Sequence, residues 1–178
     1  MTSLQSLLPH ATESAQWSEA ITYKRNQLII TAGDQASDLL YIESGAVRIY
    51  VLDGDIEQII RFGYSGEIVT ALDCFLTGKL TQLYMQSLRK TTVRKLSNQV
   101  LRKAISNDVH LNKQWMQLLE SMNMQQLERE IDLLTTSPAD RYQRVLDRSP
   151  RLFQEVPLRH IANYLRMTPE TLSRIRNS

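Results

Sequence analysis

Between Ile21 and Leu96, short apolar runs alternate with groups of turn-forming residues such as Gly, Asp and Ser. Short runs at this spacing are typical of β-strands in a sandwich or a barrel. Two of the runs, AVRIYVL and IEQIIRF, flank Asp53-Gly54-Asp55. A glycine between two such runs can supply the positive φ of a hairpin turn. We therefore interpret the two aspartates as turn residues and predict a β-domain over this part of the chain.

After Ser97 the pattern changes from strand-like runs to helical spacing. A short helix follows Ser97, and the stretch from Asp108 to Leu134 contains neither Pro nor Gly. Its apolar residues recur mostly three or four positions apart, as on one helix face. At 1.5 Å per residue this helix would extend roughly 40 Å, which is long for a helix that only covers a small β-domain. We therefore predict a dimer helix, with a plain core helix as the alternative. The residues assigned to the dimer helix are Leu111, Trp115, Leu118, Met122 and Gln125.

The last stretch, PLRHIANYLRMTPETLSRIRNS, has the pattern of two short helices joined by a tight turn. Ala162 is small enough to allow the helices to approach closely. Thr168 can cap the second helix, and Pro169 fits its first position, where a missing N–H is harmless. The shared core would contain Ile161, Leu165, Met167, Leu172 and Ile175. This pattern predicts a helix-turn-helix, and an ordinary helical hairpin is the alternative.

The outer face of the second helix carries residue types that can bind DNA. Arg can donate two hydrogen bonds to guanine, Glu can accept one from cytosine, and Ser or Thr can bind phosphates or base edges. The expected DNA-binding residues are Thr168, Pro169, Glu170, Thr171, Ser173, Arg174 and Arg176. Arg166 stands in the turn, where glycine is normally preferred, and a positive φ there would cost on the order of 1 kcal/mol.

The charge distribution indicates a polyanionic partner for the C-terminal part. Residues 135–178 contain eight arginines and four acidic residues, although the net charge of the whole chain is only +2. We expect the arginines between positions 141 and 159, and Arg176, to contact phosphates. An arginine-rich face that is simply solvated is the alternative.

The remaining composition excludes several classes of protein. Cys74 is the only cysteine, so the sequence excludes an intrachain disulfide and a cysteine-ligated iron–sulfur cluster, and we expect Cys74 to be a small buried hydrophobe. The three histidines have no metal-ligand spacing and none lies within residues 21–96, so we expect no metal site and no enzymatic activity. No run reaches the roughly 18 apolar residues of a membrane span, and the N-terminus lacks a secretory signal. We expect a cytoplasmic protein without a membrane partner.

In the order of its parts the chain resembles the Crp/Fnr family of transcription regulators. The resemblance rests on AGD…DLLYIESGAVRIY and on IANYLRMTPETLSRI, in which Glu170 and Arg174 match two residues that face DNA in the family. It implies an α+β fold that begins with a double-stranded β-helix at 1–107, the β-roll of cyclic nucleotide-binding domains. A long dimerisation helix at 108–134 and a winged-helix-type helix-turn-helix at 135–178 would follow.

The resemblance also implies a ligand site in the β-roll. In the cyclic nucleotide binders of the family, a Gly-Glu pair opens a phosphate-binding loop, and an Arg followed by small residues closes it. Gly66-Glu67 matches the opening, but the chain has no arginine from Ser65 to Ser87 and offers only Lys79. A cyclic phosphate needs a matched cation, and lysine lacks the two-pronged geometry of arginine. Gly66, Glu67 and Lys79 form the candidate effector pocket, yet we expect no cofactor, because a cyclic nucleotide is disfavoured and Gly66-Glu67 can be a simple turn.

These observations predict a sequence-specific DNA-binding transcription regulator that acts as a homodimer. Its two recognition helices would enter successive major grooves roughly 34 Å apart and read a palindrome. Its partners would be double-stranded DNA, a second copy of the chain, an unknown small-molecule effector and, as a further candidate, RNA polymerase. The alternative is a small-molecule sensor or protein-interaction module with a degenerate helix-turn-helix that no longer binds DNA strongly, as Arg166 and the chain end soon after Ile175 would allow.

Overall fold

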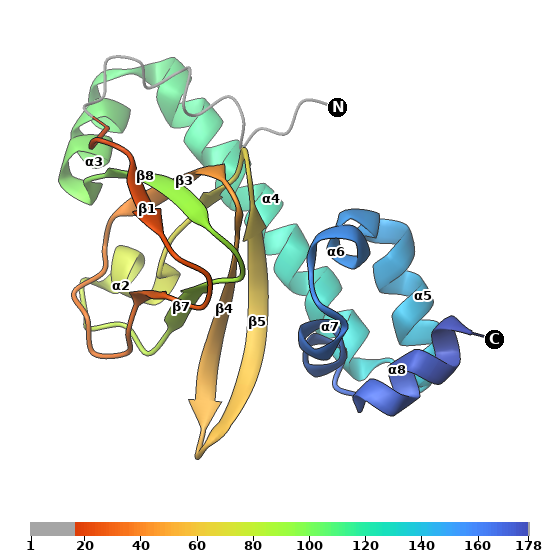
Figure 1. The fold of residues 1–178 in the computed structure, drawn as a ribbon. Helices are drawn as coiled ribbons and strands as arrows, with labels where there is room; N and C mark the ends of the chain where they lie inside the picture. Colours follow the sequence, from red (N-terminus) through yellow and green to blue (C-terminus); the bar gives the residue numbers. More distant parts are fainter. Residues whose placement is uncertain (1–16, 178) are drawn as a thin grey trace. The chain divides into compact units, whose positions relative to one another are not determined.

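The computed structural model describes residues 17–177, which form two compact units (Figure 1). Within the described residues, the first unit contains 17–51 and 60–120, and the second contains 52–59 and 121–177. The tip of one hairpin therefore belongs to the same unit as the C-terminal helices. Residues 1–16 of the predicted β-roll domain, and Ser178, lie outside the described residues.

The strands of the β-roll form two four-stranded sheets, with the orders β1-β8-β3-β6 and β2-β7-β4-β5. The strands are β1 (Ile21–Tyr23), β2 (Leu28–Ile30), β3 (Leu39–Ser44), β4 (Ala46–Asp53), β5 (Ile56–Tyr64), β6 (Ile68–Val69), β7 (Tyr84–Ser87) and β8 (Thr91–Leu96). Gly54 has a φ of 59° in the turn between β4 and β5, as the hairpin prediction requires. The α+β class with an N-terminal β-roll is confirmed, and the described strands form two sheets rather than a closed barrel.

The core of the first unit lies between these two sheets. Ile42, Val47 and Val93 are fully buried in one cluster, and each comes from a different strand. Cys74 lies in the same cluster on helix α2 (Leu72–Thr77), so the prediction of a small buried hydrophobe at this position is confirmed. Ala71, just before α2, belongs to the same cluster, so the cluster packs this helix onto the strands.

Two helices follow the β-roll, α3 (Asn98–Asn107) and α4 (Val109–Leu134). Helix α4 confirms the long helix predicted from the absence of Pro and Gly, and it begins in the first unit and ends in the second. Within the first unit, Leu111 and Leu118 have only 5% and 2% of their surface exposed. The Trp115 ring packs against Phe75, with 5.4 Å between the ring centroids. Three of the five residues assigned to the dimer helix therefore pack within their own chain.

The C-terminal part of the second unit contains the helices α5 (Pro138–Arg148), α6 (Pro150–Glu155), α7 (Leu158–Tyr164) and α8 (Pro169–Arg176). Ser137 caps α5 by accepting a hydrogen bond from the N–H of Asp140 at 3.3 Å. Every element between residues 135 and 177 is a helix, so the strands of the expected wing are not found in this part of the chain. Residues 150–155 form α6, and Pro150 occupies its first turn, where proline is well tolerated.

Candidate DNA-binding helix pair and β-roll loop

The turn between α7 and α8 has the geometry of a helix-turn-helix. The Thr168 hydroxyl accepts a hydrogen bond from the N–H of Thr171 at 3.2 Å, and Pro169 is the first residue of α8. The N–H of Met167 reaches back to the carbonyl of Ala162 at 3.0 Å. Arg166 has a φ of 55°, so the strain predicted for a non-glycine residue in this turn is present. The cap and the closing hydrogen bond hold the turn in spite of that strain.

A small apolar core joins α7 to α8. Ile161, Leu165 and Leu172 have no exposed surface, and Ala162 has only 1%. Met167 and Ile175 are half-buried at the edge of this core. The predicted core of the helix pair is therefore formed, and the inner face of α8 is used in packing against α7.

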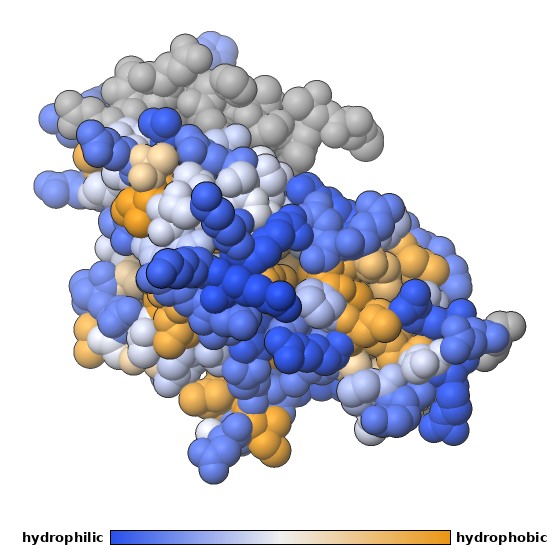
Figure 2. All heavy atoms as spheres, in the orientation of Figure 1, coloured by the Kyte–Doolittle hydropathy of each residue, from blue (hydrophilic) through white to orange (hydrophobic). Residues whose placement is uncertain are grey.

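The outer face of α8 is polar and exposed. Glu170, Ser173, Arg174 and Arg176 are exposed, and the surface over α8 in Figure 2 is mostly hydrophilic. Hydrogen bonds from its own N–H and from Thr168 lower the pKa of Glu170, and the charge of Arg174 acts in the same direction. The carboxylate at the start of α8 and the arginines in its last turn both match the helix dipole. Among the other predicted residues, Thr168 and Pro169 are exposed and Thr171 is half-buried.

A buried carboxylate at the end of α4 binds two of the arginines of α5. The Asp132 side chain has no exposed surface, and it accepts hydrogen bonds from Arg144 at 3.3 Å and from Arg148. Glu128, one turn earlier, pairs with the same two arginines at 3.0 and 3.4 Å. The hydrogen bond that Arg148 donates to Asp132 is the main cause that raises the pKa of Arg148. These two arginines, although partly exposed, therefore join α5 to α4.

Other arginines of the predicted phosphate-contacting group are also engaged inside the unit. Arg151 pairs with Glu155 on α6, and Arg141 is 9% exposed. Arg159 is exposed on α7 and remains the member of the range 141–159 best placed to contact phosphate.

Arg129, on α4, packs against Tyr164 of α7. Its Nη2 donates to the carbonyl of Tyr164, and its guanidinium lies 3.7 Å from the centre of the Tyr164 ring. Burial is the main cause that lowers the pKa of Arg129.

Asn163 on α7 makes two hydrogen bonds that the sequence did not suggest. Its Nδ2 donates to the carbonyl of Glu57 at 2.8 Å, and its Oδ1 accepts from the N–H of Ile59 at 2.9 Å. Both partners belong to the hairpin tip of the same unit. More than 100 residues separate Asn163 from each partner along the chain. A contact of this kind has no local sequence signal.

The Gly66-Glu67 pair forms a tight turn between β5 and β6. Gly66 has a φ of 86°, and the Glu67 carboxylate accepts a hydrogen bond from the N–H of Tyr64 at 3.1 Å. Glu67 thus binds the backbone of its own turn. Lys79 is exposed and follows Gly78, which ends α2 in the left-handed conformation.

The segment that follows α2 is organised by Asp73, a residue that the sequence did not single out. Its Oδ1 accepts hydrogen bonds from the Thr81 hydroxyl at 2.7 Å and from the N–H of Cys74 at 2.8 Å. Its Oδ2 accepts from the N–H of Gln82 at 2.8 Å. Burial by itself would raise the pKa of Asp73, but the hydrogen bonds from Gln82, Thr81 and Cys74 outweigh it and lower this pKa.

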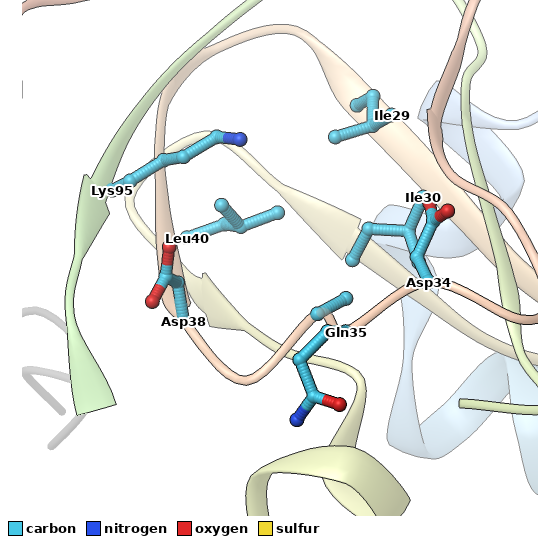
Figure 3. Close-up of a pocket in the computed structure, with 8 residues that line it drawn as sticks. Ile29, Ile30, Asp34, Gln35, Asp38, Leu40 and Lys95 are labelled. Carbon is cyan, nitrogen blue, oxygen red and sulfur yellow. The ribbon is translucent and has the colours of Figure 1, made fainter. Parts of the chain in front are cut away.

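A pocket of about 320 Å³ lies beside the loop between β2 and β3 (Figure 3). Ile29, Ile30 and Leu40 supply its apolar wall, Lys95 extends across it, and Asp34 and Asp38 stand at its edge. The lining thus offers one ammonium and two carboxylates. An anionic ligand needs a net positive lining, so this pocket does not favour a phosphate.

Comparison with known proteins agrees with these observations. The cyclic nucleotide-binding domain profile matches residues 20–108, which is half of the chain. No curated protein matches the chain in sequence. Among the described residues, none of the helices combines the length and apolar character of a membrane span.

Several solved structures share the fold over most of the chain. FixK2 from Bradyrhizobium japonicum superposes with a TM-score of 0.76 at 23% identity, covering 91% of this chain and 83% of its own. A CooA mutant from Carboxydothermus hydrogenoformans gives 0.72 at 17% identity, with 90% and 75% covered. The c-di-GMP-responsive global regulator CLP of Xanthomonas campestris gives 0.67 at 18% identity, with 98% and 88% covered. At these identities the likeness establishes the fold. The chain belongs to the cyclic nucleotide-binding domain family and has the fold of the Crp/Fnr transcription regulators.

Proposed function

We propose that the protein is a sequence-specific DNA-binding transcription regulator that acts as a homodimer. The observation that carries the proposal is the division of α8 into two faces. Leu172 is fully buried against α7, while Glu170 and Arg174 are exposed one helical turn apart. A helix held in this way presents a rigid polar edge to the major groove. The intact cap at Thr168 favours a working helix-turn-helix over a degenerate one.

The exposed residues divide into two functional groups. Arg174 and Glu170 would contact base edges, because Arg can bind guanine with two hydrogen bonds and Glu can accept one from cytosine. Arg159 and Arg176 would contact phosphates and position the dimer without reading sequence. Binding that uses phosphates releases counterions, so the affinity for DNA should fall steeply as salt rises.

The dimer interface is proposed on a different face of α4 from the one that the sequence indicated. Met124, Leu127, Ile131 and Leu134 are between 38% and 74% exposed and lie three, four and three positions apart. This spacing gives a continuous apolar seam along one side of the helix, as in two-stranded coiled coils. Met122 is half-buried and Gln125 is exposed, and the helical spacing places both of them away from this seam.

Leu127→Glu should convert the dimer into a monomer. A carboxylate at the centre of an apolar seam would lose hydration without gaining a partner, so we expect the dimer dissociation constant to rise at least about a hundredfold. Analytical ultracentrifugation over a range of concentrations measures this constant. Gln126→Glu adds the same charge to the neighbouring exposed position off the seam and should leave the constant nearly unchanged. An equal effect of both variants would place the interface elsewhere.

In-vitro selection of DNA from a random pool tests the regulator function itself. We expect the full-length protein to enrich a palindrome whose half-sites lie one helical turn apart. Arg174→Ala should then remove about 1–3 kcal/mol of preference for the selected sequence. Arg176→Ala, on the same helix, should weaken binding to all sequences alike and reduce its salt dependence. Failure to enrich any sequence would contradict the proposal, and equal losses in the two variants would make Arg174 a phosphate contact.

A small molecule that binds the first unit would control DNA binding through α4, because this helix continues into the second unit. The protein would exist in two arrangements of its DNA-binding units. An effector can shift the equilibrium between them only by the difference between its affinities for the two. The charges around the pocket in Figure 3 favour a neutral or zwitterionic molecule over an anion.

A further inference from the structure

The three donors that converge on Asp73 form an anion site in the β-roll. Two are backbone N–H groups, from Cys74 and Gln82, and the third is the Thr81 hydroxyl; all three lie 2.7–2.8 Å from a carboxylate oxygen. Backbone N–H groups supplemented by a hydroxyl are the donors that loops use to bind phosphate oxygens. Here the anion that they bind belongs to the chain itself.

This site lies within the segment that would bind the phosphate of a cyclic nucleotide. The resemblance places that loop between the turn at Gly66-Glu67 and the stretch that ends at Ser87, and Asp73, Thr81 and Gln82 all fall inside it. The loop needs a cation or other donors to hold a phosphate, and the chain has no arginine there. The Asp73 carboxylate already accepts from two backbone N–H groups and one hydroxyl of this loop.

We propose that Asp73 is a built-in anion that takes the place of a bound phosphate, so that the β-roll keeps its ligand loop closed by itself and does not respond to cyclic nucleotides. This inference deepens the proposed function, on which it rests in treating the β-roll as the regulatory unit. It assigns Asp73 as the residue that determines ligand specificity. An incoming phosphate would have to displace a carboxylate that is covalently part of the loop, and the two negative charges would repel each other.

The hydrogen-bonding groups of Thr81 are already satisfied within the chain. Thr81 is 2% exposed; its N–H donates to the carbonyl of Asp34 at 3.0 Å, and its own carbonyl accepts from Gly33 at 2.8 Å. Its hydroxyl also accepts from the N–H of Leu83 at 3.0 Å while it donates to Asp73. Each polar group of Thr81 thus has a partner within the chain, and a nucleotide would find none of them available.

The charge state of Asp73 makes this closure independent of pH in the neutral range. The pKa of Asp73 lies below the usual value for an aspartate. A carboxylate with a lowered pKa stabilises the folded loop at all pH values above the unfolded pKa, and the contribution is lost only as the pH falls through the folded pKa. The closed loop should therefore persist from neutral pH down to about pH 4, the ordinary pKa of an aspartate.

Backbone NMR of the full-length protein can test the proposal through the amide of Gln82. In the Asp73→Ala variant, we expect that amide to exchange with solvent about tenfold or more faster than in the wild type, because a hydrogen bond to a charged acceptor is lost. Added acetate or inorganic phosphate should restore its protection in the variant by filling the vacated place. The same salts, and cyclic AMP, should leave the wild-type amide unchanged.

Two further variants keep the experiment decisive. Asp73→Asn has nearly the same shape but presents an N–H₂ group to one of the donors, so it should also release the Gln82 amide even if the alanine variant fails to fold. Asp34→Ala removes another loop carboxylate, which accepts a hydrogen bond from the N–H of Thr31 at 2.8 Å, and should leave the Gln82 amide protected.

Two results would overturn the proposal. One is a perturbation of the wild-type Gln82 amide by cyclic AMP at micromolar concentration, because the site would then accept a nucleotide. The other is full protection of that amide in both Asp73 variants, because the carboxylate would then not organise the loop. None of these readouts uses DNA, so they stand apart from the selection experiment, and a protein that bound no DNA could still confirm the role of Asp73.

Discussion

The substitution Asp132→Ala should destabilise the C-terminal helical unit by about 3–5 kcal/mol, the usual cost of removing one partner of a buried ion pair. The Asp132 side chain has no exposed surface and accepts hydrogen bonds from Arg144 and Arg148. Without it, both guanidinium groups would lose their buried acceptor and keep only the more exposed Glu128. Because these contacts join α4 to α5, we also expect the variant to lose affinity for DNA.

Glu128→Ala is the matched control for this prediction. Glu128 pairs with the same two arginines, at 3.0 and 3.4 Å, but its side chain is 37% exposed. Water can replace an exposed carboxylate, so the loss should stay below about 1 kcal/mol. Urea unfolding followed by far-UV circular dichroism, which is sensitive to the C-terminal helices, gives both values. Similar losses in the two variants would show that burial of Asp132 does not govern the strength of the network.

The substitution Gly45→Ala should destabilise the β-roll by about 2–5 kcal/mol. Gly45 joins β3 to β4 with a φ of 101°, a conformation that residues with a side chain rarely adopt. A Cβ added there would lie 2.4 Å from the Thr91 hydroxyl oxygen, 2.6 Å from the Thr91 Cα and 2.7 Å from the Lys90 carbonyl oxygen. Two of these three atoms belong to the backbone, so the clash cannot be relieved by a change of rotamer.

Gly33→Ala separates the cost of the positive φ from the cost of the close contact with Thr91. Gly33 has a similar φ of 96°, but a Cβ there would have no neighbour within 4 Å. The variant should therefore lose only the conformational part, about 1–2 kcal/mol. Trp17 and Trp115 both lie in the first unit, so tryptophan fluorescence during urea unfolding reports its stability. If Gly33→Ala cost as much as Gly45→Ala, the close contact with Thr91 would not be the main cause.

Features determined by neighbouring residues could be predicted from the sequence. The Asp53-Gly54-Asp55 turn needs only a glycine between two apolar runs, and α4 needs only a long stretch without Pro or Gly. The helix-turn-helix core and the strain at Arg166 follow from offsets of a few residues within one motif. These are local requirements, and the folded chain satisfies them where the pattern indicates.

Features that depend on distant residues could not be predicted. From the composition, Arg144 and Arg148 were expected to contact phosphates, but in the structure they bind Asp132 of α4. The helical spacing in α4 marks apolar residues without saying which face the β-roll will cover, so the contact of Trp115 with Phe75 could not be foreseen. Asp73 was not singled out from the sequence, because its role arises only when Thr81 and Gln82 fold back onto it.

The two hydrogen bonds of Asn163 bear on how proteins of this architecture can exchange their parts. The residues that form hydrogen bonds with this side chain, Glu57 and Ile59, are encoded more than a hundred codons upstream of it. A chimera that took its β-roll from one gene and its C-terminal helices from another would separate the asparagine from the hairpin residues that it contacts. Successful domain shuffling should therefore transfer the hairpin sequence along with the C-terminal helices, although the two are far apart in the gene.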